Sequence, residues 1–271
     1  MRPLEDIGRA EVEKDLNGRV QSVDRAMTLL EALSEDDKGQ RLTDLARRTG
    51  LSLTTVHRLL TTLEQRHFVQ FSLRDNLWHI GRQTYMVGSA FVRDRHFVAP
   101  ALPFLRRLRD LTKETANLGV VDNGEIILVN QVESREVARA VSRVGGRTPM
   151  TASGMGKAIL SCYSSDEVSA AVSRTGMRRL TSQTLTTREE LDSELEQARD
   201  DGYAVDNEEY QNGLRCVAAP VFDSHQEVVC AISVSGGPNR MRPERLSALG
   251  RLVAQTANEL TIALGGRPLR G

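Results

Sequence analysis

The N-terminal third of the chain carries apolar residues at helical spacing, separated by short polar breaks. A first helix is predicted from about Val23 to the acidic turn at 34–39. Its apolar face is formed by Val23, Ala26, Met27, Leu29, Leu30 and Leu33. The segment 42–50 predicts a second, short helix that ends at Gly50, because glycine readily turns the chain in a left-handed conformation.

A third helix is predicted after Ser52, whose side chain is suited to cap it. Its inward positions are Val56, Leu59, Leu60 and Leu63. Residues 68–81 follow, rich in β-forming residues on both sides of the turn Arg74-Asp75-Asn76, which predicts a β-hairpin. Helix, glycine turn, helix and hairpin together predict a winged helix-turn-helix.

The connector has a helical pattern over 83–97, with Tyr85, Met86, Phe91 and Val92 as its apolar positions. Pro100 and Pro103 then interrupt this pattern, and a further helix is predicted to about Thr115.

Beyond the connector the spacing of apolar residues changes from the helical pattern to one typical of strands. Strands are predicted over 118–122, 125–132, 137–144, 215–223 and 227–236, and Asn123-Gly124 is a hairpin turn. Helices are predicted near Ser153, over 166–174, over 188–201 up to Gly202, and from Pro243 to about Leu264.

These elements predict an α+β protein with an N-terminal winged helix-turn-helix domain, a connecting helix and a C-terminal α/β domain. We assign residues 1–19 to a mobile tail, 20–82 to the winged helix-turn-helix, 83–99 to the linker helix and 100–265 to the second domain. A length of 271 residues agrees with two domains of ordinary size.

Composition excludes several classes of protein. No segment is long and apolar enough to span a membrane, and the N-terminus lacks the apolar region of a signal peptide, so we expect a cytoplasmic protein without a membrane partner. The three cysteines form no CxxC pair, so neither a disulfide framework, a metal site nor a cofactor is expected. Lys plus Arg and Asp plus Glu both total 36, so net charge gives no indication of nucleic-acid binding.

The outward face of the third helix carries short hydroxyl side chains and Arg58, which suit phosphates and base edges. Arg58 is the first candidate for a bidentate contact to guanine. The predicted DNA-contacting residues are Arg25, Arg47, Ser52, Thr54, Thr55, Arg58, Thr62 and Arg74. A solvated helix face, or a surface that binds another protein, is the alternative interpretation.

A second candidate site begins at Ser153 and Gly154, where the free N–H groups of a helix start favour an anion. The nearby GMGK is not a P-loop, because Thr151 and Ala158 occupy two decisive positions of that motif. Asp206, Cys216, Ser233 and Ser235 are further polar candidates.

Four segments together resemble the IclR family of bacterial transcriptional regulators, in particular the glyoxylate-sensing regulators of glyoxylate and allantoin metabolism. They are VQSVDRAMTLLEAL, LTDLARRTGLSLTTVHRLLTTLE, TASGMGKAIL, and GYAVDNEEYQNGLRCVAAPVFD with AISVSG. The resemblance implies a GAF-like effector domain, and a homodimer or a dimer-of-dimers tetramer on a palindromic double-stranded operator.

The resemblance also implies which residues hold a small carboxylic acid such as glyoxylate or pyruvate. Polar contacts are implied for the backbone of Gly154 and Met155 and for the side chains of Asp206, Cys216, Ser233 and Ser235. Apolar walls are implied for Val137, Ala140, Thr148 and Leu214. Met155 departs from the small residue usual in glyoxylate sensors.

We therefore expect a DNA-binding repressor, and not an enzyme, whose operator affinity is set by a small organic acid. One alternative is the same regulator sensing an aromatic or sugar acid. Another is an enzyme that uses Cys216 as a nucleophile on a small oxo acid, with Asp206 or a histidine as base.

Overall fold

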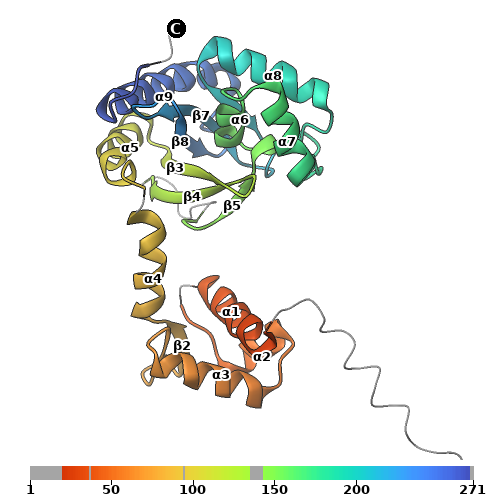
Figure 1. The fold of residues 1–271 in the computed structure, drawn as a ribbon, viewed down its shortest axis with the longest axis vertical. Coiled ribbons are helices and arrows are strands. Elements are labelled where there is room, and N and C mark those ends of the chain that lie inside the picture. Colours follow the sequence, from red (N-terminus) through yellow and green to blue (C-terminus); the bar gives the residue numbers. More distant parts are fainter. Residues whose placement is uncertain (1–19, 37, 94, 135–142, 269–271) are drawn as a thin grey trace, which may run out of the picture. The chain divides into compact units, whose positions relative to one another are not determined.

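A computed structural model describes residues 20–36, 38–93, 95–134 and 143–268 of the chain. The chain forms two compact units, divided between residues 94 and 95. Each unit is described by itself, and Figure 1 shows the elements of both. No described helix has the length and apolar character needed to cross a membrane.

The N-terminal unit contains the predicted helix-turn-helix. Its helices are α1 (Gln21–Ser34), α2 (Leu42–Thr49) and α3 (Leu53–Gln65). Gly50 ends α2 with φ of 70°, in the left-handed region that favours glycine. Ser52 caps α3, since its side-chain oxygen accepts a hydrogen bond from the backbone N–H of Thr55. Both signals were predicted from the sequence and are confirmed.

The predicted wing is also confirmed. Strands β1 (Val69–Ser72) and β2 (Leu77–Ile80) pair in antiparallel register. Phe71 lies opposite Trp78, with ring centroids 5.1 Å apart, and Trp78 is buried in the core of the unit with Leu29, Leu45, Val56 and Leu60. This contact ties the hairpin to the three helices.

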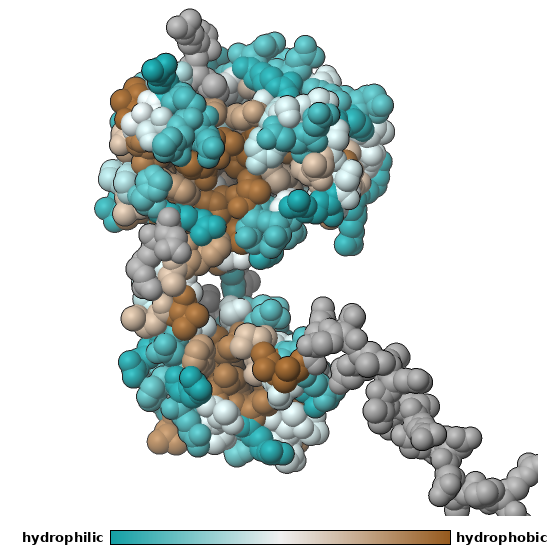
Figure 2. All heavy atoms as spheres, in the orientation of Figure 1, coloured by the Kyte–Doolittle hydropathy of each residue, from teal (hydrophilic) through white to brown (hydrophobic). Residues whose placement is uncertain are grey.

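The face predicted for α1 is partly wrong. Leu29, Ala32 and Leu33 are buried, whereas Val23 is 54% and Met27 47% exposed. The helix crosses its neighbours through its C-terminal half, so its N-terminal apolar residues extend past the core. Together with Val20, which directly precedes the helix, they form an exposed apolar row, and Figure 2 shows apolar surface over this helix.

The connector contains α4 (Arg82–Arg93), which ends earlier than the predicted residue 97. A separate helix, α5 (Val98–Thr112), follows and carries Pro100 and Pro103 in its first two turns. It ends before Thr115, because Lys113 adopts a left-handed conformation with φ of 63° and Thr115 already begins a strand. The predicted helix limits at both places are therefore corrected.

The C-terminal unit is built on one six-stranded sheet in the order β5-β4-β3-β8-β7-β6, with antiparallel pairing between all neighbours. The strands are β3 (Thr115–Asp122), β4 (Glu125–Val132), β5 (Arg147–Pro149), β6 (Ala204–Asn207), β7 (Arg215–Phe222) and β8 (Val228–Gly236). The hairpin turn at Asn123-Gly124 is confirmed, with positive φ at both residues.

Two short strands, β5 and β6, were not predicted, because three or four residues show too little alternation to identify. The strand predicted over 137–144 lies largely outside the described residues, and its last two, Arg143 and Val144, are not in a strand.

Helices cover both faces of this sheet (Figure 1). One face contacts α5 and α9 (Pro243–Ala263). The other carries a 3-10 turn (Met150–Ala152) and α6 (Gly154–Leu160), α7 (Ser165–Thr175) and α8 (Arg188–Asp201). Their apolar residues form one core cluster with the sheet, including Ile159, Leu160, Leu191 and Ala218. The predicted α+β architecture with an N-terminal winged helix-turn-helix is thus confirmed.

Candidate functional site

The outward face of α3 is polar, as predicted. Val56 and Leu60 are buried against the unit's core, which turns Thr54, Arg58 and Thr62 to the surface. The Thr62 hydroxyl donates to the carbonyl oxygen of Arg58 at 2.9 Å, so it presents lone pairs outward in this state. Thr55 and Ser52 share a hydroxyl contact of 2.9 Å at the start of the helix.

The arginines around α3 fall into two groups. Arg47 pairs with Asp44 within α2, and Arg48 pairs with Glu35. By contrast, the guanidinium groups of Arg58, Arg74 and Arg25 make no hydrogen bond or ion pair with any described residue. Arg74 is exposed in the turn of the hairpin, and Arg25 is half-buried on α1. Arg58 and Arg74 are therefore available to an anion without first breaking an ion pair.

In the C-terminal unit, strand register brings the predicted acid-binding residues together. Asp206 on β6 lies opposite Cys216 on β7, and Cys216 lies opposite Ser235 on β8. Ser233, two residues earlier on β8, has the same orientation as Ser235 because side chains alternate along a strand. All four consequently face α6 across one side of the sheet.

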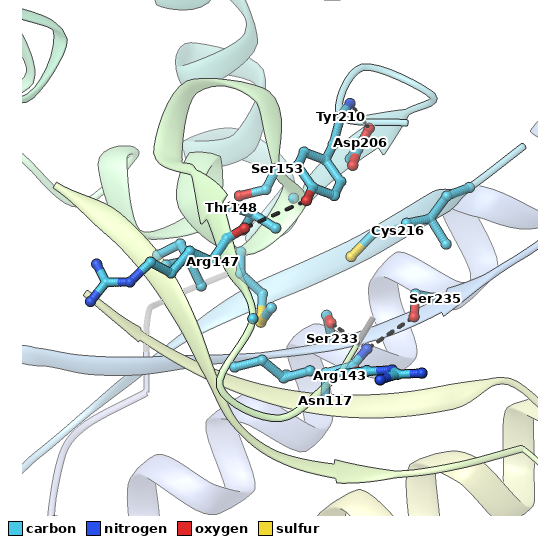
Figure 3. A pocket seen from close by; sticks show the side chains of 16 residues that line it. Asn117, Arg143, Arg147, Thr148, Ser153, Asp206, Tyr210, Cys216, Ser233 and Ser235 are labelled. Atoms are coloured by element: carbon cyan, nitrogen blue, oxygen red, sulfur yellow. Dashed lines mark hydrogen bonds between the residues drawn. The ribbon is translucent and has the colours of Figure 1, made fainter. Parts of the chain in front are cut away.

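These residues line a cavity of about 230 Å³ between the sheet and the start of α6 (Figure 3). The predicted residues Gly154, Met155, Asp206, Cys216, Ser233, Ser235, Thr148 and Leu214 all line it. Val137 and Ala140, also predicted, lie outside the described residues. Ser153, with which the sequence begins this candidate site, also lines the cavity. Further lining residues that were not predicted are Asn117, Ile126, Leu128, Arg143, Gly146, Arg147 and Tyr210.

The start of α6 approaches the sheet closely. Ser153 caps the helix through a hydrogen bond from the N–H of Gly156, which leaves the N–H groups of Gly154 and Met155 at the cavity. A Cβ atom on Gly154 would lie 3.1 Å from the Cys216 sulfur, so a side chain there would crowd the cavity floor. The helix has seven residues, so donors at its start matter more than its small dipole.

The long side chain of Met155 has room beside the sheet because a glycine lies opposite it. A Cβ atom on Gly119 of β3 would stand 2.8 Å from the Met155 sulfur. The thioether therefore packs against bare backbone while the rest of the side chain forms a wall of the cavity.

Asp206 is buried, with 2% of its surface exposed. One carboxylate oxygen accepts the N–H of Glu209 at 2.8 Å. Burial and the neighbouring Glu209 carboxylate raise the pKa of Asp206 to about 7, against a smaller opposing effect of that backbone hydrogen bond. Glu209 pairs in turn with Lys157 of α6, a fully buried lysine.

Cys216 is a poor nucleophile in this setting. Burial, followed by the charge of Asp206, raises the pKa of its thiol to about 12. Since thiolate is the reactive form of cysteine, this environment disfavours the enzyme alternative.

Sequence reasoning missed Asn117 and Lys157 although each carried a signal. Asn117 is an amide directly before an apolar run, residues 118–121, and Lys157 falls among the apolar residues of α6. A polar side chain at a core position needs a hydrogen-bond partner, so each of these residues indicated a buried polar contact. In the structure Asn117 bonds to Ser233 and Lys157 to Glu209.

Comparison with known proteins finds matches over most of the chain. The family model described as "IclR helix-turn-helix domain" matches residues 22–72, and that described as "Bacterial transcriptional regulator IclR C-terminal" matches residues 89–262. The transcriptional repressor IclR of Escherichia coli is 40% identical over 251 residues, which cover 92% of each chain.

The acetate operon repressor of Salmonella typhimurium is 39% identical over 253 residues, covering 93% of this chain and 92% of that one. Among solved structures, the IclR protein of Thermotoga maritima has a TM-score of 0.78 and 26% identity, over 91% of this chain and all of that one.

Proposed function

Because this chain belongs to the IclR family of bacterial transcriptional regulators, we propose that it is a repressor whose operator affinity is set by a small organic acid. The α3 and hairpin surface binds the operator, and the acid occupies the cavity beside α6. The matched relatives from E. coli and S. typhimurium are named as repressors, which supports repression over activation.

The chemistry of the cavity is the main support for the proposal that the protein binds an organic acid. Hydroxyl groups of Ser233 and Ser235 and the backbone N–H groups of Gly154 and Met155 lie around one small space with apolar walls. Such converging donors suit an acceptor-only group, and a carboxylate is the common metabolite group of that kind.

Glyoxylate and pyruvate are the first candidates for the acid. Glyoxylate, which has five heavy atoms, cannot bind better than about −7.5 kcal/mol, a Kd of a few micromolar, at the roughly −1.5 kcal/mol per atom that the best small ligands reach. Such an affinity suits the sensing of a metabolite. The cavity of about 230 Å³ has room for several waters besides such an acid, so aromatic and sugar acids remain alternatives.

On the DNA side, we assign the direct base contact to Arg58 and phosphate contacts to Arg74 and Arg47. Arg58 projects from the middle of α3 and has no ion pair with a described residue to break. Thr54, Thr55, Ser52 and Thr62 lie along the same helix and supply hydroxyl contacts to phosphates, with Arg25 at the edge of the unit.

We also propose that two copies of the chain associate through the apolar surfaces of α1 and α4. Large apolar residues are exposed in one copy. They are Val20, which directly precedes α1, Val23 and Met27 on α1, and Tyr85, Met86, Val87 and Phe91 on α4. A second copy is the natural occupant, because a dimer places two α3 helices on the half-sites of a palindrome. A tetramer would form as a dimer of such dimers.

A thermal-shift screen tests the acid-binding half. Glyoxylate, pyruvate, benzoate and gluconate are each added in excess to the full chain, and at a hundred times Kd the binding acid adds about 2.7 kcal/mol of stability. The Ser233→Ala/Ser235→Ala variant serves as control and should show no shift with the same acid. Absence of a shift with every acid in wild-type protein would contradict acid sensing.

A further inference from the structure

The side chain of Asn117 is held by hydrogen bonds on both its atoms. Its Nδ2 donates to Ser235 Oγ at 3.0 Å and to Ser233 Oγ at 3.2 Å (Figure 3). Its Oδ1 accepts from Gln131 Nε2 at 2.9 Å. With 3% of its surface exposed, Asn117 lies at the floor of the cavity, where an unpaired amide would be costly.

A β-bulge brings Gln131 to this position. Leu118 pairs with Asn130, whereas Gly119 pairs with Leu128, so Val129 is an extra residue in β4. The extra residue reverses the alternation along the strand, and Gln131 rather than Asn130 faces Asn117. The strand is thus shaped to supply a donor to the oxygen of Asn117.

The direction of the amide follows from a third contact. Nδ2 also lies 3.4 Å from the carbonyl oxygen of Thr115, and a carbonyl oxygen can only accept a hydrogen bond. When the NH2 group faces Thr115 and the two serines, each of its three neighbours can accept a hydrogen bond. In the flipped orientation the Asn117 oxygen would face that carbonyl oxygen without a hydrogen between them.

A serine hydroxyl that accepts from Asn117 keeps its own hydrogen for another acceptor. Ser233 and Ser235 both line the cavity, and the Ser233 hydroxyl also interacts with the sulfur of Cys216, a weak acceptor that a carboxylate replaces readily. We propose that Asn117 is a positioning residue that makes Ser233 and Ser235 hydrogen-bond donors toward the cavity, and so selects a carboxylate over an alcohol or amide. This inference rests on the proposed acid-binding function.

Asn117→Asp tests the inference with almost no change in shape. The new carboxylate still accepts from Gln131 but presents an oxygen to the two serines, so their hydroxyl hydrogens turn away from the cavity. In calorimetric titration with glyoxylate at pH 8.5, we expect affinity to fall about a hundredfold, since each of two hydrogen bonds to a charged group is lost. Asn130→Asp adds the same charge one register position away, outside the cavity lining, and should leave affinity within twofold of wild type.

The pH dependence separates this role from structural damage. At pH 5.5 the buried new carboxyl is protonated, its O–H can donate to one serine, and part of the affinity relative to wild type should return. An equal loss at both pH values, or glyoxylate affinity within threefold of wild type at pH 8.5, would overturn the inference.

A neutron structure of the deuterated, unliganded wild-type protein gives a readout that needs neither acid binding nor a folded variant. Deuterium on the Asn117 atom that faces the serines supports the inference, and an oxygen at that place overturns it. If wild-type protein binds no acid, the proposed function fails while this orientation is still decided.

Discussion

The ammonium nitrogen of Lys157 lies 2.6 Å from a carboxylate oxygen of Glu209, and no part of the Lys157 side chain is exposed to solvent. Lys157 follows Gly154 and Met155 on α6, and Glu209 follows Asp206 after β6. The ion pair therefore joins the two elements that present the backbone donors and the carboxyl group of the cavity. Glu194 of α8, at 3.1 Å from the same nitrogen, is a partly exposed second partner.

We predict that Lys157→Met lowers the free energy of unfolding by roughly 3 to 5 kcal/mol, because it leaves Glu209 buried without its cation. The double variant Lys157→Met/Glu209→Gln should regain most of that loss, since both charges are removed together. Urea unfolding of the wild type, both single variants and the double variant completes the cycle. A loss below 1 kcal/mol in Lys157→Met would show that the pair is not coupled as described.

Asp206→Asn should stabilise the unliganded protein at alkaline pH. The pKa of Asp206 in the folded protein, about 7, lies above its ordinary value of 3.8, so burial of the ionised carboxylate destabilises the fold. This cost is fully present above pH 7, decreases as the pH falls, and is absent below pH 3.8. At about 1.4 kcal/mol per pH unit, the advantage of asparagine is roughly 4 kcal/mol at pH 8 and less than half of that at pH 5. Denaturation of both proteins at the two pH values measures it; a larger gain at pH 5 would contradict the assignment.

Acid binding should itself depend on the protonation of Asp206. A ligand carboxylate beside an ionised Asp206 is repelled, whereas a protonated Asp206 can donate to it. Affinity for glyoxylate should stay nearly constant below pH 6 and fall about tenfold per pH unit above 7, where binding takes up one proton. Calorimetry across pH 5.5 to 9 gives the profile, and Asp206→Asn should flatten it. A profile unchanged in that variant would assign the titration to another group.

The sequence predicted the helix-turn-helix and the wing well because their signals are local. Gly50 and Ser52 fix a turn and a cap within a few residues, and the spacing of Val56 and Leu60 fixes the buried face. The exposed start of α1 was missed, because periodicity shows that a face is apolar but not where a neighbouring helix ends. Val23 and Met27 therefore appeared equivalent to Leu30 and Leu33.

The cavity could be predicted only in part for a similar reason. Asp206, Cys216, Ser233 and Ser235 came from family resemblance, and strand register explains why they meet. Asn117 could not be found in this way, because its partners depend on an extra residue in β4 that no local pattern indicates. Lys157 and Glu209, 52 residues apart, likewise meet only through the fold.

Arg58→Ala should weaken operator binding by about 1 to 3 kcal/mol and relax sequence preference at one base position. Arg74→Ala is the matched control, because loss of a phosphate contact weakens binding to all sequences alike and reduces its salt dependence. Binding is measured by fluorescence anisotropy on DNA from upstream of the protein's own gene and on variants of it. Equal binding by Arg58→Ala and wild type would remove α3 as the reading helix.

The most direct test of the account measures operator affinity of the full chain as a function of the acid that the thermal-shift screen identifies. We predict that saturating acid changes the Kd for DNA by about 5 to 150-fold per coupled site, a coupling of roughly 1 to 3 kcal/mol. The Ser233→Ala/Ser235→Ala variant should bind DNA normally and fail to respond. An acid that binds wild-type protein by calorimetry yet leaves its operator affinity unchanged would contradict the claim that this cavity controls DNA binding.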